Sequence, residues 1–324
     1  MTEPVHGQAA HGDDWRLFRG DNEAREPVLP AAPPWRSLGG PGGRTGTPRP
    51  YRISPVHADV VNAALHLRRP LLVTGRPGTG KTSLAGAIAH ELTLGPVLHW
   101  PVNSRSSLQD GLYRYDAIGR LRESNLAREF GGGEPDIGGF VRLGPVGTAL
   151  VPTGRPRVLL VDELDKGDVD LPNDLLTVFE DGAFEIPELA RLPEDQAEVD
   201  VLTADAGSPR ARVVRGRVAC TEFPVVVITS NGERDFPPAF LRRCLRLDLP
   251  DPDEDRLREI VEAHLGPEAL ADTEDVLGDF LNRREYGELA TDQLLNAVFL
   301  RRSGVDLAAN DLIDAVLHSL GGTV

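Results

Sequence analysis

At residues 70–92 the chain reads PLLVTGRPGTGKTSLAGAIAHEL. An apolar run is followed by a glycine-rich loop and then by apolar residues at helical spacing, so this stretch predicts a buried strand, a tight loop and a helix. The loop has the spacing G-x-x-x-x-G-K-T, which is typical of a phosphate-binding P-loop. A chance glycine-rich turn is the alternative, and the flanking strand and helix argue against it. The expected phosphate-binding residues are Gly75, Arg76, Pro77, Gly78, Thr79, Gly80, Lys81, Thr82 and Ser83.

Lys81 is one of only two lysines in a chain whose 35 basic residues are otherwise all arginine. A compact ammonium reaches the β- and γ-phosphates as a point charge, which a planar guanidinium would fit poorly. The loop N–H groups and the N-terminal end of the following helix favour the same anion. Thr82 adds a hydroxyl that can hold Mg²⁺. The loop therefore predicts a site for ATP and Mg²⁺, although the motif does not distinguish ATP from GTP.

A second chemical motif is the apolar run VLLVDE at residues 158–163. We expect Asp162 to hold Mg²⁺ opposite Thr82 and Glu163 to polarise the attacking water. Asn231 follows the next strand candidate, and its amide can orient the same water. Two solvent-facing acids and an ordinary Asn-Gly turn are the alternatives for these residues.

Arg242 and Arg243 stand immediately before the strand candidate Cys244–Leu249. One interpretation is that they are surface charges. The other is that one of them reaches into the nucleotide site of an adjacent subunit and stabilises the charge of the transition state. Their sequence positions do not rank the two residues.

The chain divides into three stretches with different patterns. Residues 51–250 alternate helical segments with continuous Val/Leu/Ile runs, which predicts an α/β domain with a parallel sheet covered on both faces. Residues 251–324 have only helical patterns and predict a small all-α domain. The strand candidates are residues 70–74, 96–102, 157–162, 224–229 and 244–249, and the C-terminal helical segments lie near 253–265, 269–283, 289–302 and 306–320.

Residues 1–50 are rich in Pro, Gly and Arg, and we expect this N-terminal strap to be extended or partly disordered. It nevertheless contains Trp15 and Trp35, two of the three tryptophans. Either these rings dock on the body of the protein or on a neighbouring subunit, or the strap is only a tail.

Two insertions interrupt the α/β pattern, at about residues 104–156 and 184–222. Loops of this length are uncommon without a function. In the second insertion, Glu198–Thr203 and Ala211–Val218 alternate in part like the strands of a hairpin. Either insertion is a candidate for gripping a protein client, and an ordinary surface loop is the alternative.

Composition limits the class of protein. The net charge of −15 argues against sequence-independent binding to nucleic acid, which requires a basic patch. No apolar run approaches the length of a membrane span, and no secretory signal is visible. Cys220 and Cys244 are too few for a zinc cluster or a disulfide framework, so we expect buried, inert thiols and a cytoplasmic location.

Three segments together resemble a MoxR-type AAA+ ATPase: the P-loop, DELDK at residues 162–166, and TSNGERDFPPAFLRRC at residues 229–244. The resemblance covers about residues 51–265. It implies a five-stranded parallel sheet flanked by helices, a helical lid, and a ring, usually a hexamer, that works on protein clients. It also implies a partner with a von Willebrand factor A domain. The strap and the segment LYRYDAIGRL further resemble a branch that is linked to bacterial conflict systems.

The resemblance assigns roles to single residues. Lys81 and Thr82 match the P-loop residues, Asp162 and Glu163 match the second motif, and Asn231 matches the sensor asparagine. The arginine finger is matched by Arg242 or Arg243. Asn103 stands where the family often has a polar switch residue that contacts the catalytic acid. The usual lid arginine is missing at its expected place, and Arg283 or Arg284 could substitute for it.

These observations predict a Mg²⁺-dependent ATPase that remodels or activates a protein partner. One alternative is a scaffold that binds ATP and recruits an effector with little turnover. A nucleic-acid-dependent motor is another, and the acidic balance counts against it.

Overall fold

In the computed structural model of the chain, the described residues are 15–18, 21–35, 51, 53–271, 273–286, 289–308 and 311–318. The rest of the predicted strap, residues 1–14, 19–20 and 36–50, lies outside them. The chain divides into two compact units. One is an α/β unit within residues 51–250, and the other is a helical unit that includes residues 251–324.

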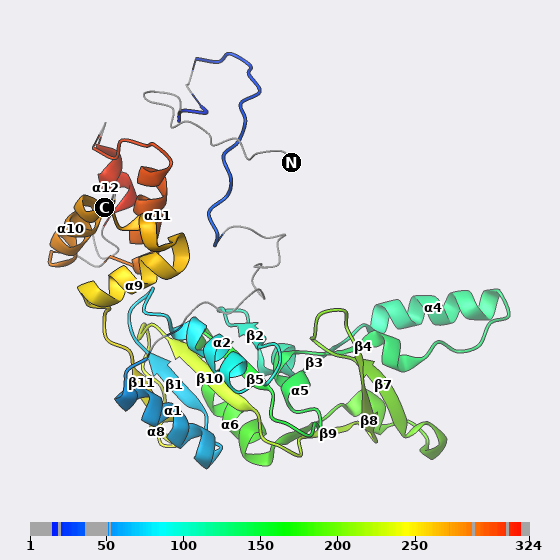
Figure 1. Cartoon of the computed structure of the whole chain (residues 1–324). Helices are drawn as coiled ribbons and strands as arrows, with labels where there is room; N and C mark the ends of the chain where they lie inside the picture. Colours follow the sequence, from blue (N-terminus) through cyan, green and yellow to red (C-terminus); the bar gives the residue numbers. More distant parts are fainter. Residues whose placement is uncertain are drawn as a thin grey trace, which may run out of the picture. The chain divides into compact units, whose positions relative to one another are not determined.

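The α/β unit is built on a parallel five-stranded sheet in the order β11-β1-β10-β5-β2 (Figure 1). The predicted fold class is therefore confirmed. Each strand lies inside one of the predicted apolar runs or extends it by one residue. The strands are β1 Leu71–Thr74, β2 Leu98–Pro101, β5 Val158–Asp162, β10 Val225–Ser230 and β11 Leu245–Asp248.

Helices cover both faces of this sheet, because successive residues of each strand point to opposite sides. On one face, Leu71, Val73 and Val227 pack with residues of α1 (Pro55–Leu67) and α2 (Lys81–Glu91). The opposite face packs against three other helices through strand residues such as Leu72, Leu159 and Ile228. These helices are α5 Pro145–Ala149, α6 Leu171–Asp181 and α8 Pro238–Leu241.

The register of the sheet aligns the carboxyl ends of its strands. Thr74, the last residue of β1, pairs with Ser230, the last residue of β10. At the other side of the sheet, Asp162 at the end of β5 pairs with Pro101 at the end of β2. The loops that follow β1, β5 and β10 therefore begin side by side at one edge. Crevices at this edge of open parallel sheets are where ligands bind.

The two insertions join in a second sheet, which the sequence did not predict. Its six strands have the order β3-β4-β7-β8-β9-β6. The two strands from residues 104–156 therefore lie together on one side, and they join the four strands of the second insertion through the pairing of β4 with β7. The strands are β3 Tyr113–Tyr115, β4 Val141–Leu143, β6 Ala183–Glu185, β7 Glu198–Leu202, β8 Arg210–Val214 and β9 Arg217–Ala219. The insertions therefore form one arm, which we call the insertion arm.

Within the second insertion, β7 and β8 form the predicted hairpin. The predicted strand 211–218 was wrong in one respect, because it is split into β8 and β9 by a turn at Arg215 and Gly216. Both turn residues have positive φ, 53° and 70°, as a tight type I′ hairpin requires. A Cβ at Gly216 would lie 2.5 Å from the backbone nitrogen of Ala190, so only glycine fits there.

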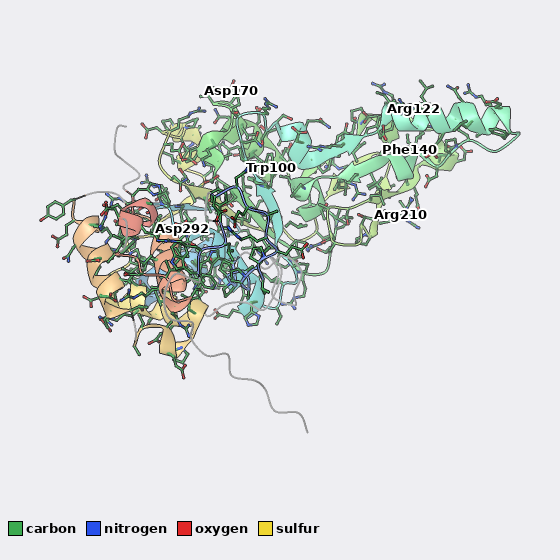
Figure 2. The ribbon with its side chains drawn as sticks, turned by 90° about the horizontal axis from the view of Figure 1, so that it is seen from above. Trp100, Arg122, Phe140, Asp170, Arg210 and Asp292 are labelled. Carbon is green, nitrogen blue, oxygen red and sulfur yellow. The ribbon has the colours of Figure 1, made fainter. Side chains whose placement is uncertain are left out.

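One long helix, α4, and several short helical segments complete the insertion arm: α3 Leu108–Leu112, α4 Ala117–Glu129, η1 Ile137–Phe140, α7 Pro187–Ala190 and η3 Glu194–Gln196. Helix α4 extends away from the core sheet, and Arg122 on α4 lies far from Trp100 of β2 (Figures 1 and 2). The ion pair between Arg157 and Asp205, at 2.6 Å, connects the start of β5 to the β7–β8 loop. Thr148 of α5 adds a hydrogen bond from the Ala204 N–H to its hydroxyl.

The helical unit has its own core, which includes Leu257, Phe280 and Leu294. Asp253 caps its first helix by accepting a hydrogen bond from the N–H of Arg256. The last helix is much shorter than the predicted segment 306–320. The helices are α9 Glu254–Leu265, η4 Pro267–Ala269, α10 Glu274–Arg284, α11 Thr291–Arg302 and α12 Leu312–Val316. No helix among the described residues is long and apolar enough to cross a membrane.

The described part of the strap, residues 15–18 and 21–35, contains no helix or strand. Trp35 packs its ring edge-on against Phe299 of α11, with 5.8 Å between the ring centroids. Trp15 is 40% exposed. Trp35 therefore docks on the body of its own chain, which was one of the predicted alternatives. Of the two free cysteines, Cys244 is buried, as expected, whereas Cys220 is half-buried.

Candidate active site

The P-loop lies between β1 and α2 at the carboxyl edge of the sheet. Gly78 and Gly80 have φ values of 82° and 89°, a conformation that L-residues with a Cβ rarely adopt, so the loop can curl tightly before the helix begins. Gly80 is the N-cap of α2, and Ser83 is exposed in the first turn of that helix. The loop N–H groups and the helix N-terminus therefore lie together, as an anion site requires.

Lys81 is buried at the first position of α2. Its Nζ donates hydrogen bonds to the carbonyl oxygens of Gly75, at 2.6 Å, and Arg76, at 2.8 Å, which hold the ammonium inside the loop. Burial lowers the pKa of Lys81, and the nearby carboxylates of Asp165, Asp162 and Glu163 oppose this shift only in part. The charged form would be further stabilised by phosphate oxygens in the loop.

Asp162, the last residue of β5, contacts side chains from three other elements: α2, β10 and β2. Its Oδ1 accepts hydrogen bonds from Thr82, at 3.0 Å, and from Thr229, at 2.7 Å, while its Oδ2 lies 3.1 Å from Nε2 of His99. Burial alone would raise the pKa of Asp162, but the hydrogen bonds from His99, Thr229 and Thr82 together lower it. The residue is therefore held as a carboxylate.

The pair of Thr82 and Asp162 fits Mg²⁺. A hydroxyl and a carboxylate oxygen 3.0 Å apart are the hard oxygen ligands that this ion prefers. No group of three or more His, Cys, Asp or Glu side chains that could hold a metal occurs among the described residues. These two residues would therefore need phosphate oxygens and water to complete the coordination.

Glu163 follows Asp162 with a positive φ of 59°, which turns its side chain out of the strand direction. Its N–H donates to Oγ1 of Thr229, at 2.8 Å. Its Oε1 lies 3.2 Å from Nδ2 of Asn231, so the sensor candidate contacts the acid itself. Oε1 also lies 2.9 Å from Nζ of Lys166, the second lysine of the chain.

Asp165 fixes the loop that carries Asn231. It is only 3% exposed, and its Oδ2 accepts hydrogen bonds from the N–H groups of Asn231, at 3.0 Å, and Glu233, at 3.1 Å. Arg234 strengthens the same connection by donating to the carbonyl of Gly167 at 2.8 Å. The turn after β5 and the loop after β10 are thereby joined.

Four residues that the sequence patterns did not predict also lie at the site: His99, Asp165, Lys166 and Thr229. Only Lys166 left a signal, since lysine is so rare in this chain. Asn103 was expected to contact the catalytic acid. Its side chain instead accepts a hydrogen bond from the N–H of Arg105, at 2.9 Å, and closes a turn.

Arg242 and Arg243 lie at the amino-terminal ends of the core strands, whereas the P-loop lies at their carboxyl-terminal ends. They precede β11, whose first residue, Leu245, pairs with Leu71 at the start of β1, whereas the P-loop follows the end of β1. Strands of this length separate the two edges by roughly 10 Å. Neither arginine is therefore beside the Lys81 and Asp162 cluster of its own chain.

The two arginines differ in their surroundings. Arg243 forms an ion pair with Glu180 of α6 and donates to the carbonyl of Ala239 at 3.1 Å. The side chain of Arg242 is exposed and has no partner among the described residues. In the helical unit, Arg283 pairs with Asp314 at 2.6 Å, and Arg284 donates to the carbonyl of Pro252 at 2.6 Å. Both arginines thus have partners within that unit.

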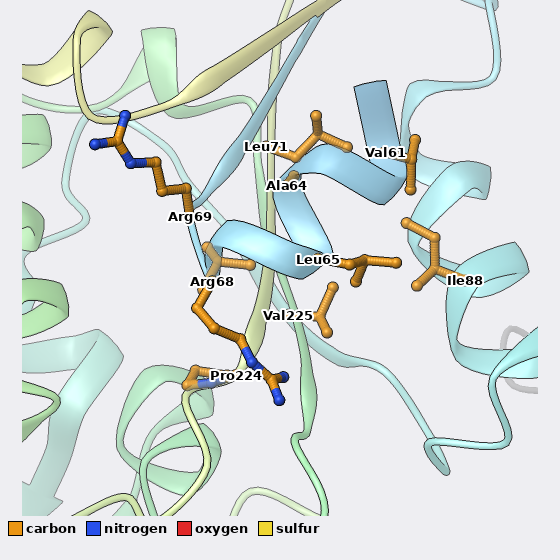
Figure 3. Close-up of a pocket in the computed structure, with 10 residues that line it drawn as sticks. Val61, Ala64, Leu65, Arg68, Arg69, Leu71, Ile88, Pro224 and Val225 are labelled. Atoms are coloured by element: carbon orange, nitrogen blue, oxygen red, sulfur yellow. The ribbon is translucent and has the colours of Figure 1, made fainter. Parts of the chain in front are cut away.

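An apolar pocket also opens at the amino edge of the core sheet (Figure 3). Its lining includes the apolar residues Val61, Leu65 and Ile88, and the charged residues Arg68 and Arg69 also line it. Arg68 is paired with Glu222 at 3.1 Å. None of the predicted site residues lines this pocket, so it is separate from the P-loop site.

Comparisons with known proteins identify the family of the chain. Residues 70–244 match the family model described as "AAA domain (dynein-related subfamily)". The chain is also similar to the chaperone protein ClpB of Chlamydia pneumoniae, with 26% identity over 205 residues, and to that of Chlamydia muridarum, with 25% identity over 205 residues. Each match covers 60% of this chain but 22% of the relative, so the chain spans about a fifth of the length of these relatives. Since the family model covers more than half of the chain, the protein belongs to the AAA domain family, dynein-related subfamily.

Proposed function

We propose that this protein is a Mg²⁺-dependent ATPase that uses hydrolysis to remodel or activate a protein partner. One observation carries the proposal. Lys81 and Thr82 at the start of α2, Asp162 and Glu163 at the end of β5, and Asn231 in the loop after β10 lie close together at the carboxyl edge of the sheet. Groups that can bind phosphate, hold a metal ion and accept a proton therefore lie next to one another.

The residues have distinct roles in the proposed reaction. The P-loop N–H groups and Lys81 bind the β- and γ-phosphates, and Thr82 and Asp162 hold Mg²⁺. The ion, when bound, neutralises charge on the phosphate oxygens. Glu163 accepts a proton from the attacking water, whose oxygen bonds to the γ-phosphorus as the bond to the β,γ-bridging oxygen breaks. ADP and phosphate are the products, and Asn231 orients Glu163 through Oε1.

A protein partner is supported by two observations. The relatives are named chaperone proteins, although the chain spans only about a fifth of their length. The order and spacing of DELDK and TSNGERDFPPAFLRRC resemble the MoxR branch. We therefore propose a ring, with a hexamer as the expected form, and a von Willebrand factor A-domain protein as the candidate partner. The insertion arm is the candidate surface for gripping a client.

Steady-state phosphate release by the full chain, with ATP and with or without Mg²⁺, tests this function. Glu163→Gln should lose most of the turnover, whereas Glu262→Gln, the same change at an exposed position of α9, should keep it. If the wild-type chain binds ATP but releases no phosphate, alone or with a partner, the scaffold alternative replaces the ATPase. Stimulation by single- or double-stranded DNA or by RNA would instead favour a nucleic-acid motor.

A further inference from the structure

The turn after β5 places the Lys166 ammonium beside Glu163, the proposed catalytic base. Residues Leu164–Lys166 form a single 3₁₀ turn, η2, with Glu163 at its N-cap. The N–H of Lys166 donates to the Glu163 carbonyl at 3.0 Å. Side chains three residues apart lie on the same side of such a turn. The turn therefore directs the Lys166 ammonium toward the Glu163 carboxylate, where the Nζ–Oε1 distance is 2.9 Å.

The two donors to Glu163 use the same oxygen. Nζ of Lys166 and Nδ2 of Asn231 both contact Oε1, at 2.9 and 3.2 Å. No described residue donates a hydrogen bond to Oε2. The Glu163 side chain is 40% exposed, so this second oxygen can face water. The hydrogen bond to Glu163 raises the pKa of Lys166, which keeps the ammonium charged.

Resting on the proposed ATPase function, we propose that Lys166 is a positioning residue for Glu163. Together with Asn231 it holds Oε1, so that Oε2 is the oxygen that accepts the proton of the attacking water. The proton leaves the water as its oxygen bonds to the γ-phosphorus, and Lys166 itself neither gains nor loses a proton.

The choice of lysine has a physical reason. An arginine donates through a planar fork and frequently binds both oxygens of a carboxylate. At position 166 such a fork would occupy Oε2 as well as Oε1 and would compete with the water. An ammonium contacts one oxygen as a point charge and leaves the other available. This accounts for a lysine at position 166 in a chain whose other basic residues, apart from Lys81, are arginines.

Two substitutions test the proposal. Lys166→Arg keeps the charge, and Lys166→Met keeps much of the length without the charge. In both variants kcat should fall by about tenfold or more, because a base that is misaligned loses part of its catalytic contribution. KM for ATP, the Kd of a fluorescent ATP analogue and the melting temperature should match the wild type. Arg302→Met, at an exposed cation of α11, is the matched control and should keep its kcat.

The comparison between lysine and arginine separates positioning from a structural ion pair. If Lys166 only stabilised the turn, Lys166→Arg would retain both kcat and melting temperature, and this outcome would overturn the proposal. An increase in kcat for Lys166→Met would also overturn it, because the pair would then restrain Glu163. Absence of turnover in the wild-type chain in the same assay would contradict the ATPase function itself, whereas wild-type turnover with unchanged Lys166 variants would contradict only the positioning role.

Discussion

The hydroxyl of Thr82 lies 3.0 Å from Oδ1 of Asp162, although 80 positions separate the two residues in the chain. Thr82 is the second residue of α2, which follows β1 and the P-loop, and Asp162 ends β5. Strand β10 lies between β1 and β5, and its Thr229 donates to the same carboxylate oxygen at 2.7 Å. The contact therefore depends on the parallel pairing of three strands. On one side of it lie the P-loop and Lys81, which we call the phosphate side, and on the other lie Glu163 and Asn231, which we call the base side.

On the phosphate side, Lys81→Ala should abolish hydrolysis and weaken ATP binding by about tenfold or more, since hydrogen bonds to charged groups contribute roughly 1.5–3 kcal/mol. Titration with a fluorescent ATP analogue measures this change. Arg128→Ala, which removes an exposed cation, is the control. Wild-type affinity in the Lys81 variant would falsify the phosphate role of this lysine.

Glu163→Gln should mainly slow hydrolysis, whereas Asp162→Asn should mainly weaken Mg²⁺-dependent binding of ATP. The first variant keeps size and hydrogen bonding but cannot take the proton, so it should bind ATP and Mg²⁺, hydrolyse slowly and accumulate in its assembled form. The second should bind ATP more weakly in the presence of Mg²⁺ and respond less to the ion. Binding measured with and without Mg²⁺ distinguishes them. Turnover of Glu163→Gln equal to the wild type would mean that another group activates the water.

The different surroundings of Arg242 and Arg243 rank them as arginine fingers. Arg242→Ala should bind ATP normally but hydrolyse it poorly, and fingers of this kind contribute ~10³–10⁵ in rate. Arg243→Ala should mainly lose its partly exposed ion pair with Glu180, which costs at most about 1 kcal/mol of stability. Mixing Arg242→Ala with Lys81→Ala protein should restore activity. No rescue in assemblies shown to be mixed would count against a shared site.

The ion pair of Arg157 and Asp205 should anchor the insertion arm in a pH-dependent way. The hydrogen bond from Arg157 lowers the pKa of Asp205 below its ordinary value of 3.8. The pair therefore stabilises the fold above that value, and its contribution is lost as the pH falls through the lower, folded-state pKa. Asp205→Asn should cost about 1–3 kcal/mol at pH 7 and speed amide exchange in β7 and β8. The difference between variant and wild type should shrink in acid, and a constant difference down to pH 2 would contradict this role.

The two strap tryptophans should behave differently. Trp35 packs against Phe299, so Trp35→Ala should destabilise the helical unit by about 1–2 kcal/mol, as seen in thermal or denaturant melts. Trp15→Ala should leave that stability unchanged, because this ring is 40% exposed. If Trp15 contacts a neighbouring subunit, its variant should shift sedimentation toward smaller species in the Glu163→Gln background with ATP. Unchanged sedimentation would leave that part of the strap as a tail.

Much of the fold could be predicted from local patterns. Continuous apolar runs such as Val158–Val161 can only be buried on both faces, and the G-x-x-x-x-G-K-T spacing specifies the backbone path between a strand and a helix. The core strands, their parallel direction and the helical C-terminal unit followed from this information. The residue types at positions 81, 82, 162, 163 and 231 also indicated their chemistry, because that chemistry depends on few side-chain types.

Tertiary structure decided which side chains meet. His99 and Thr229 contact Asp162 because strand register places them beside it, and register depends on pairing between residues far apart in the chain. The same reason explains why the two insertions share one sheet, and why Arg243 is bound to Glu180 while Arg242 stays exposed. Lys166 stood out in the sequence only by its rarity. Its contact with Glu163 required the 3₁₀ turn that follows β5, a local conformation set by the packing around it.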